Sequence, residues 1–400
     1  MFLLSKIRSW QSLICRRGRE EEAMTDPRIT KLTLLFTDEK TDATEEVAPD
    51  LLSFTYSDKE ADQADEISLT LKDETGKWAG SWRPDAGETI RAYIQSIGVS
   101  KQKLFCGKFY VDSMRASGSP RICEIRAVSV PLKAPIRRRL VSKAWEKYTL
   151  KRIASEIAKK AEISLIFETE EDPEYDRLDQ KDESDLAFLT RLCRDAGFSL
   201  KVTDDTIVIF DQTRFEKMDP ICTLELGKAD ILSWDFQNEQ SETYKSCVVS
   251  WRDIKKKIRK SVGGYNIDLE KPSTNPPAKY NIDLEKIDSS NARKNPAVNT
   301  YVYIDPDADD NGQEYKLKKR VTSRAEAERL AKATLRKLNL RKLTGLMTLV
   351  GDTRLVAGVV VEVKGFGSFD GRFFVESATH SVSGSGYTTS INVRRVNNKY

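Results

Sequence analysis

The chain has 400 residues, enough for two or three domains, and 32% of them are charged. Its 66 Lys and Arg nearly balance its 62 Asp and Glu, which argues against specific nucleic-acid binding through a basic field. The six scattered cysteines include no CxxC pair, so neither a zinc site nor a disulfide framework is indicated. No run approaches the ~20 apolar residues of a membrane-spanning segment, and no phosphate-binding loop suggests a cofactor.

The first 23 residues are predicted to be a leader or extension outside the fold, and to be disordered. Their apolar residues are interrupted by Lys6, Arg8, Arg16 and Arg17, which fits a cleavable secretory signal poorly. At Met24 begins a segment that resembles a natural protein start. A short amphipathic arm that docks on a partner or a membrane surface is the alternative.

Residues 24–144 are predicted to form a first β domain. Apolar and polar residues alternate in several short runs, and turn signals separate these runs at intervals of ten to twenty residues or so, as in a barrel or sandwich. The runs are 32–36, 52–56, 67–71, 90–94, 104–111 and 122–130.

Residues 145–212 are predicted to form a small α/β domain. Thr149 can cap a helix that runs to about residue 161, and a second helix starts at Ser184 and stops at Gly197. Two strands, 198–202 and 206–210, follow around a short turn.

Residues 213–400 are predicted to form a second β domain with one helix, which begins at a capping box of Ser323 and Glu326. The last fifty residues contain apolar runs at 359–363, 373–377, 379–382 and 387–393, separated by glycine-bearing turns. A polar insertion at about 255–316 carries the sequence YNIDLEK twice, at 265–271 and 280–286. We interpret the two copies as a surface hairpin or extended arm, with slippage duplication as the alternative.

Several residue groups could carry chemistry, but each has a simpler interpretation. His380 lies inside a strand without a nucleophile elbow nearby, so a structural histidine is favoured. A glycosidase acid needs an apolar pocket. The acidic groups lie in charged tracts and are predicted to be solvated surface; they are Glu60, Asp62, Asp65 and Glu66, and Glu170, Glu171 and Asp172.

Two further groups are weak candidates for ion binding. Asp307, Asp309 and Asn311 match the first half of a calcium loop, but the twelfth position is Lys318, so a polar turn is favoured. The basic runs at 137–139 and 255–260 lack interleaved aromatic residues and are interpreted as solvated faces or subunit salt bridges.

Three tracts resemble a known family. They are ADEISLTLKD at 64–73 with WRPDAG at 82–87 and FCGKFYVD at 105–112, then DESDLAFLTRLCRDAGF at 182–198, then the glycine-rich strands of the last fifty residues. In this order they resemble the late control gene D type hub proteins of contractile phage tails, which are related to the hub part of type VI secretion spike proteins. The matching positions, for which the resemblance implies a structural role, are Asp65, Trp82, Gly107, Asp182, Asp185, Phe188, Leu189, Arg191, Leu192, Gly197, Phe198, Gly358, His380 and Tyr387.

The resemblance implies a mainly β fold, with two antiparallel β-barrel-like hub domains and a small α/β domain. It also implies a structural protein without enzymatic activity or a cofactor, which works as a homotrimeric ring. The ring would adapt a hexameric tail tube to a trimeric spike in the baseplate of a virion or injection particle, assembled in the bacterial cytoplasm. Its expected partners are the spike protein, as a separate chain, the tail tube protein, and baseplate wedge or LysM-type tail proteins.

Two alternatives remain open at this point. A tail-associated peptidoglycan hydrolase would use some of the carboxylates described above. A receptor- or carbohydrate-binding tail protein would expose a cluster of aromatic residues, whereas most aromatic residues here occupy alternating core positions.

Overall fold

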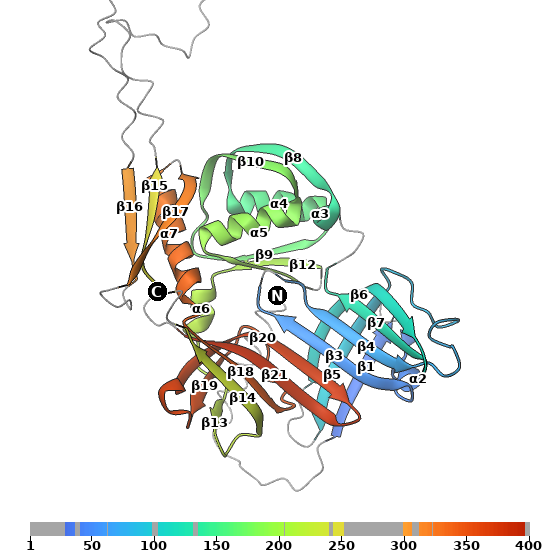
Figure 1. The fold of residues 1–400 in the computed structure, drawn as a ribbon. Helices are drawn as coiled ribbons and strands as arrows, with labels where there is room; N and C mark the ends of the chain where they lie inside the picture. The colour runs from blue at the N-terminus through green and yellow to red at the C-terminus, as the bar shows by residue number, and fades with distance from the viewer. Residues whose placement is uncertain are drawn as a thin grey trace, which may run out of the picture. The chain divides into compact units, whose positions relative to one another are not determined.

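The structure is a computed structural model that divides into two compact units (Figure 1). The first unit contains residues 1–243 and 336–400, and the second contains residues 244–335. The residues described are 29–36, 41–61, 63–97, 103–130, 135–203, 205–239, 243–251, 299–305, 312–321 and 323–396. The predicted leader and both YNIDLEK copies lie outside these ranges.

The first unit is built mainly from antiparallel strands. Apolar residues alternate with polar ones along these strands, so every second side chain can be buried on one face of the sheet. This pattern is clear in β3 (Leu51–Lys59) and β4 (Glu66–Lys72). The other N-terminal elements are β1 (Ile29–Phe36), β2 (Thr41–Asp42), α2 (Thr44–Val47), β5 (Thr89–Ile97), β6 (Lys103–Ser117) and β7 (Ile122–Val128). The C-terminal elements are β13 (Thr223–Glu225), β14 (Ile231–Asn238), β18 (Leu343–Val350), β19 (Val360–Lys364), the 3-10 helix η3 (Gly367–Phe369), β20 (Gly371–Ser383) and β21 (Gly386–Arg395).

These strands form one continuous sheet, in the order β14-β18-β21-β20-β3-β4-β7-β6-β5-β1-β2, with β13 beside β19 and β19 beside β20. The first part of β20 pairs with β19, and its second part pairs with β3, where His380 lies opposite Tyr56. One apolar core contains residues from both halves of the sheet, such as Phe54 and Ile391. The two β regions are therefore joined through β3 and β20, and the predicted boundaries near residues 145 and 213 fall inside the first unit and remain predictions.

Strand β20 differs from the expectation of two short strands at 373–377 and 379–382. It runs without interruption from Gly371 to Ser383, and its register against β21 shifts between Val375 and Ser377. Glu376 is the extra residue at this point, as in a β-bulge. A bulge, and not a turn, therefore interrupts the alternation.

The predicted α/β region contains both expected helices. In α4 (Leu150–Lys160) the Thr149 hydroxyl accepts the N–H of Arg152 at 3.3 Å, and in α5 (Asp185–Ala196) the Ser184 hydroxyl accepts the N–H of Ala187 at 3.2 Å. The predicted strands appear as β11 (Ser199–Thr203) and β12 (Thr206–Phe210), which pair with each other. The remaining elements are α3 (Pro135–Arg138), β8 (Leu140–Thr149), β9 (Ser164–Glu168), β10 (Glu174–Ser184) and α6 (Gln212–Glu216).

The second unit consists of a three-stranded sheet and most of α7 (Arg324–Asn339). Strand β15 (Tyr244–Trp251) lies between β16 (Asn299–Ile304), which is antiparallel to it, and β17 (Gln313–Val321), which is parallel. The Ser323 hydroxyl accepts the N–H of Glu326 at 3.2 Å, as the capping box predicts. The buried face of α7 packs with β15 residues; this core comprises Cys247, Val249, Val321, Ala327, Leu330, Ala331 and Leu335.

The predicted fold class, mainly β with a small α/β region, is confirmed. Among the described residues, no helix has the length and apolar character that crossing a membrane would require.

Candidate functional site

Lys201 of β11 is buried against the end of β3. Its Nζ lies 2.7 Å from Asp58 Oδ1 and 3.1 Å from Asp65 Oδ1, and it donates to the carbonyl of Lys59 at 2.6 Å. Asp58 also accepts the N–H of Ala357 at 3.0 Å, so the ion pair extends to the C-terminal half of the sheet. Although burial lowers the pKa of Lys201, the two carboxylates raise it above its ordinary value, and the ammonium stays charged.

A second buried cluster continues from the end of β3. Glu60 Oε2 accepts a hydrogen bond from the Gln212 amide of α6 at 2.6 Å. Glu216 Oε1, also of α6, accepts from Nη2 of Arg336 and from Nη2 of Arg394, each at 2.5 Å. The two clusters together are called the charged seam; it comprises Asp58, Glu60, Asp65, Lys201, Gln212, Glu216, Arg336 and Arg394.

The expectation that Glu60 and Asp65 lie on a solvated surface is wrong. Both side chains are buried, because cations and an amide from distant parts of the chain meet them. Burial raises the pKa of Glu60 to about 7, although Arg394 and Gln212 partly offset this effect. Burial also raises the pKa of Asp65, against the opposing charge of Lys201.

The motif at 182–198 builds the start of α5. Asp182 adopts a positive φ of 46°, next to a register shift between β10 and β8, and its carboxylate accepts from Ser142 Oγ at 2.7 Å. Asp185 is buried; it accepts from the amide of Gln180 at 2.9 Å and from Lys160 Nζ at 2.7 Å. These contacts fix the helix start against β10 and α4.

The rest of this motif packs the α/β region. Arg191 is ion-paired with Glu183 at 2.5 Å, and Gly197 ends the helix with a φ of 82°. The apolar motif residues contribute to the core of the region; they are Phe188, Leu189 and Leu192, with Phe198 packed against them.

His380 is fully buried where β20 meets β3 and β21. Its Nδ1 lies 2.7 Å from the Tyr387 hydroxyl and 3.3 Å from Thr389 Oγ1, and its ring stacks on Tyr56 at a centroid distance of 5.8 Å. Gly358 precedes β19 with a φ of 90°, and its N–H donates to the carbonyl of Val375. Of these motif residues, His380 and Tyr387 meet inside the sheet.

Trp82 lies in the turns between β4 and β5, and Gly107 lies in β6. Trp82 is 40% exposed; its ring meets Trp78 edge-on at 5.7 Å, and Lys77 Nζ lies 4.3 Å from its centroid. Gly107 has a φ of 133° in β6, where the register with β5 shifts.

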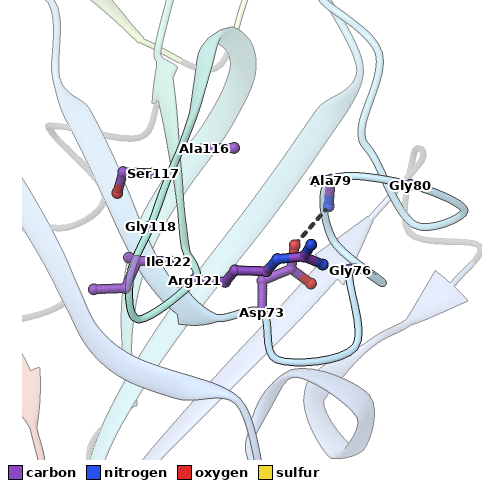
Figure 2. Close-up of a pocket in the computed structure, with 9 residues that line it drawn as sticks. All are labelled: Asp73, Gly76, Ala79, Gly80, Ala116, Ser117, Gly118, Arg121 and Ile122. Atoms are coloured by element: carbon purple, nitrogen blue, oxygen red, sulfur yellow. Dashed lines mark hydrogen bonds between the residues drawn. The ribbon is translucent and has the colours of Figure 1, made fainter.

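An open pocket lies near this tryptophan, between the turn after β4 and the hairpin of β6 and β7 (Figure 2). Asp73 accepts the N–H of Ala79 at 3.2 Å, and the Arg121 side chain extends across the pocket (Figure 2). The other lining residues are small or aliphatic: Gly76, Ala79, Gly80, Ala116, Ser117, Gly118 and Ile122. One arginine and one buried carboxylate do not indicate a particular reaction.

The two ends of the large sheet expose apolar side chains. At one end β14 pairs only with β18 among the described residues, and its Leu232 and Trp234 are 57% and 47% exposed. At the other end, as far as the described residues go, β1 pairs with β5 along its whole length but with β2 only at Leu35 and Phe36, and Ile29 is 55% exposed. Edges of this kind are available for pairing with another chain.

The remaining candidates give no site. Asp307, Asp309 and Asn311, and the basic run at 255–260, lie outside the described residues. In the part of the chain that is described, no group of three or more His, Cys, Asp or Glu could hold a metal ion. The sequence did not single out Lys201, Glu216 or Trp234; a lysine inside the mostly apolar strand at 198–202 was the one signal available.

Comparison with known proteins identifies the family. The family model of the phage tail baseplate hub (GPD) matches residues 88–386. The probable baseplate hub protein of Escherichia phage 186 is 25% identical over 367 residues, which cover 88% of this chain and 89% of the relative.

Solved structures share the fold. The tail protein from Neisseria meningitidis MC58 is 15% identical with a TM-score of 0.62, over 92% of this chain and 96% of that chain. The E. coli c3393 protein is described as a component of the type VI secretion system, with structural similarity to the T4 bacteriophage tail proteins gp27 and gp5. It is 12% identical with a TM-score of 0.51, over 88% of this chain and 75% of that chain. Because the family model spans most of its length, the chain belongs to the phage tail baseplate hub (GPD) family and is a structural, non-enzymatic component of a phage tail.

Proposed function

We propose that three copies of this hub protein form a ring that adapts the hexameric tail tube to the trimeric spike. Each copy contributes two barrel-like halves of one sheet, so three copies supply six similar units. A ring of this kind can match sixfold symmetry on one face and threefold symmetry on the other. The observation that carries this proposal is the large sheet with two accessible, apolar ends.

The two ends differ from each other, so the contact between copies is head-to-tail, with β14 of one copy against β1 of the next. Both strands have eight residues; Leu35 and Phe36 of β1 already pair with β2, so pairing can extend along the first part of β1, from Ile29. A head-to-tail contact closes into a ring when its rotation allows, whereas a self-complementary contact gives only a dimer. Burial of Leu232, Trp234 and Ile29 would supply the apolar part of the interface.

The partners follow from this arrangement. We infer that the spike is a separate chain on one face, the tail tube protein lies on the other, and baseplate wedge or LysM-type proteins attach outside. The particle would be assembled in the bacterial cytoplasm. Family membership and the fold shared with a type VI secretion component support these partners.

The test is the mass of the purified protein by light scattering, alone and with the spike protein encoded beside it. The wild type should have three chain masses, or should form a three-to-three complex with the spike. The double substitution Leu232→Glu and Trp234→Glu should give a monomer under both conditions, because it places two charges at the β14 edge. Leu140→Glu is the matched control, since Leu140 is 66% exposed but lies on β8, which belongs to a different sheet. A wild type that stays monomeric with the spike present would refute the ring.

A further inference from the structure

The charged seam contains more buried acid than buried base. Its buried carboxylates are Asp58, Glu60, Asp65 and Glu216, and its buried cations are Lys201, Arg336 and Arg394. Two less buried neighbours, Glu376 and Arg372, add one charge of each sign and leave the excess unchanged. Among the residues that the structure describes, the carboxylates of this cluster therefore outnumber its cations by one.

Glu60 is the carboxylate with the poorest pairing. Its Oε2 accepts from a neutral amide, that of Gln212, and its Oε1 is buried without a hydrogen-bond partner among the described residues. By contrast, Asp58 accepts from Lys201 and Ala357, and Glu216 accepts from two arginines. Leaving a charged oxygen buried and unpaired is costly, and a neutral carboxyl group reduces that cost.

We propose that Glu60 of the charged seam is protonated in the folded chain. This proton adds a fourth positive charge to those of Lys201, Arg336 and Arg394. The four charges balance the four carboxylates and stabilise the packing of α6 and β11 against β3 and β20. On release, the Glu60 carboxyl group becomes a carboxylate and nothing else changes. The seam then carries one net negative charge. The hold on α6 and β11 is therefore pH-dependent and weakens at higher pH.

The groups that face Glu60 come from every neighbouring element. Arg394 of β21 attracts its carboxylate, and so does Lys201 of β11. Glu376 of β20 repels it, and its carbonyl accepts the Glu60 N–H at 2.9 Å. The other charged groups of the cluster are Asp58 of β3, Asp65 before β4, Glu216 of α6 and Arg336 of α7. Loss of the proton therefore adds repulsion between Glu60 and the carboxylates of Asp58 in β3, Glu376 in β20 and Glu216 in α6.

The direction of the pH effect follows from the two protonation equilibria. Burial raises the pKa of Glu60 from 4.5 to about 7. Between these values the folded chain holds a proton that the unfolded chain has released, so the equilibrium constant for unfolding rises about tenfold per pH unit. Above the folded pKa the slope from Glu60 disappears, after a total change on the order of 300-fold.

The experiment is urea unfolding of the full chain at pH 5, 6, 7 and 8, for the wild type and for Glu60→Gln. The ratio of the wild-type unfolding constant to that of Glu60→Gln should rise about 40-fold from pH 5 to pH 7 and then level off. Glu376→Gln is the comparison, because it removes a neighbouring, partly exposed carboxylate that repels Glu60 but leaves Glu60 in place; its ratio should rise much less than that of Glu60→Gln. A ratio for Glu60→Gln that is constant with pH would overturn the proposal.

A second measurement does not depend on the folding of the variant. The infrared carbonyl band of protonated carboxyl groups should be present in the folded wild type at pH 5.5 and absent at pH 8.5. Because burial also raises the pKa of Asp65, to about 6, part of this band belongs to Asp65, and where Glu60→Gln folds the band should be weaker at pH 5.5. Absence of the band from the wild type, or a band of unchanged intensity in the variant, would also overturn the proposal.

Discussion

Lys201 is the residue that balances most of the charge at the end of β3. In the wild type the Lys201 ammonium lies 2.7 Å from Asp58 and 3.1 Å from Asp65. Replacing Lys201 with Met leaves both carboxylates buried without their cation. Removing one partner of a buried ion pair typically costs about 3–5 kcal/mol. We therefore expect Lys201→Met to lower the free energy of unfolding at pH 7 by that amount, or to prevent folding, as measured by urea unfolding.

Arg177→Met is the control for this substitution. Arg177 and Glu146 form an ion pair at 3.2 Å whose side chains are both largely exposed, and such pairs contribute less than about 1 kcal/mol. Equal effects of the two substitutions would show that the Lys201 pair is not desolvated in solution.

The sequence predicts the buried, structural role of some of these residues better than that of others. His380 occupies a strand with alternating apolar residues, so its structural interpretation follows from a local pattern. Glu60 and Asp65 lie in a charged tract, and their burial depends on Lys201 and Gln212, which are remote in the chain. A local pattern carries no information about such partners, so the charged seam could not be found from it.

The end of α5 gives a prediction for one element. Gly197 has a φ of 82°, in the left-handed region where an L side chain is strained by about 1 kcal/mol or more. Gly197→Ala should lower the free energy of unfolding by about that amount. Gly384→Ala is the control, because nothing lies within 4 Å of an added Cβ there and φ is not left-handed. Equal urea midpoints for the two variants would contradict the strain argument.

Helices were predictable from the sequence because their caps and apolar stripes are local. Thr149, Ser184 and Ser323 each accept the backbone N–H that a helix start requires. Strands β8 and β10 were missed, because they are rich in charged residues and lack a continuous apolar alternation. Their buried contribution is concentrated in Trp145, which stacks on Phe188 and donates to Gln180.

At the scale of the whole molecule, the sequence indicates two β regions but not their continuity. The pairing of β20 with β3 joins residues more than three hundred positions apart, with Ser383 opposite Ser53. No turn or short connection links these strands, so no local signal specifies their register. The continuous sheet is nevertheless what leaves β14 at one end and β1, with the two-residue β2 beside it, at the other.

These different ends predict how defective copies combine. A copy with Leu232→Glu and Trp234→Glu has lost its β14 end but keeps β1, and a copy with Ile29→Glu has lost β1 but keeps β14. In a head-to-tail ring each variant alone should be monomeric, because every contact needs one end of each kind. An equimolar mixture retains one competent contact per pair, so it should give a dimer with one copy of each and nothing larger. Light scattering of the mixture measures this directly. Dimers of a single variant would instead indicate a self-complementary contact, and a purely monomeric mixture would show that β14 and β1 do not meet.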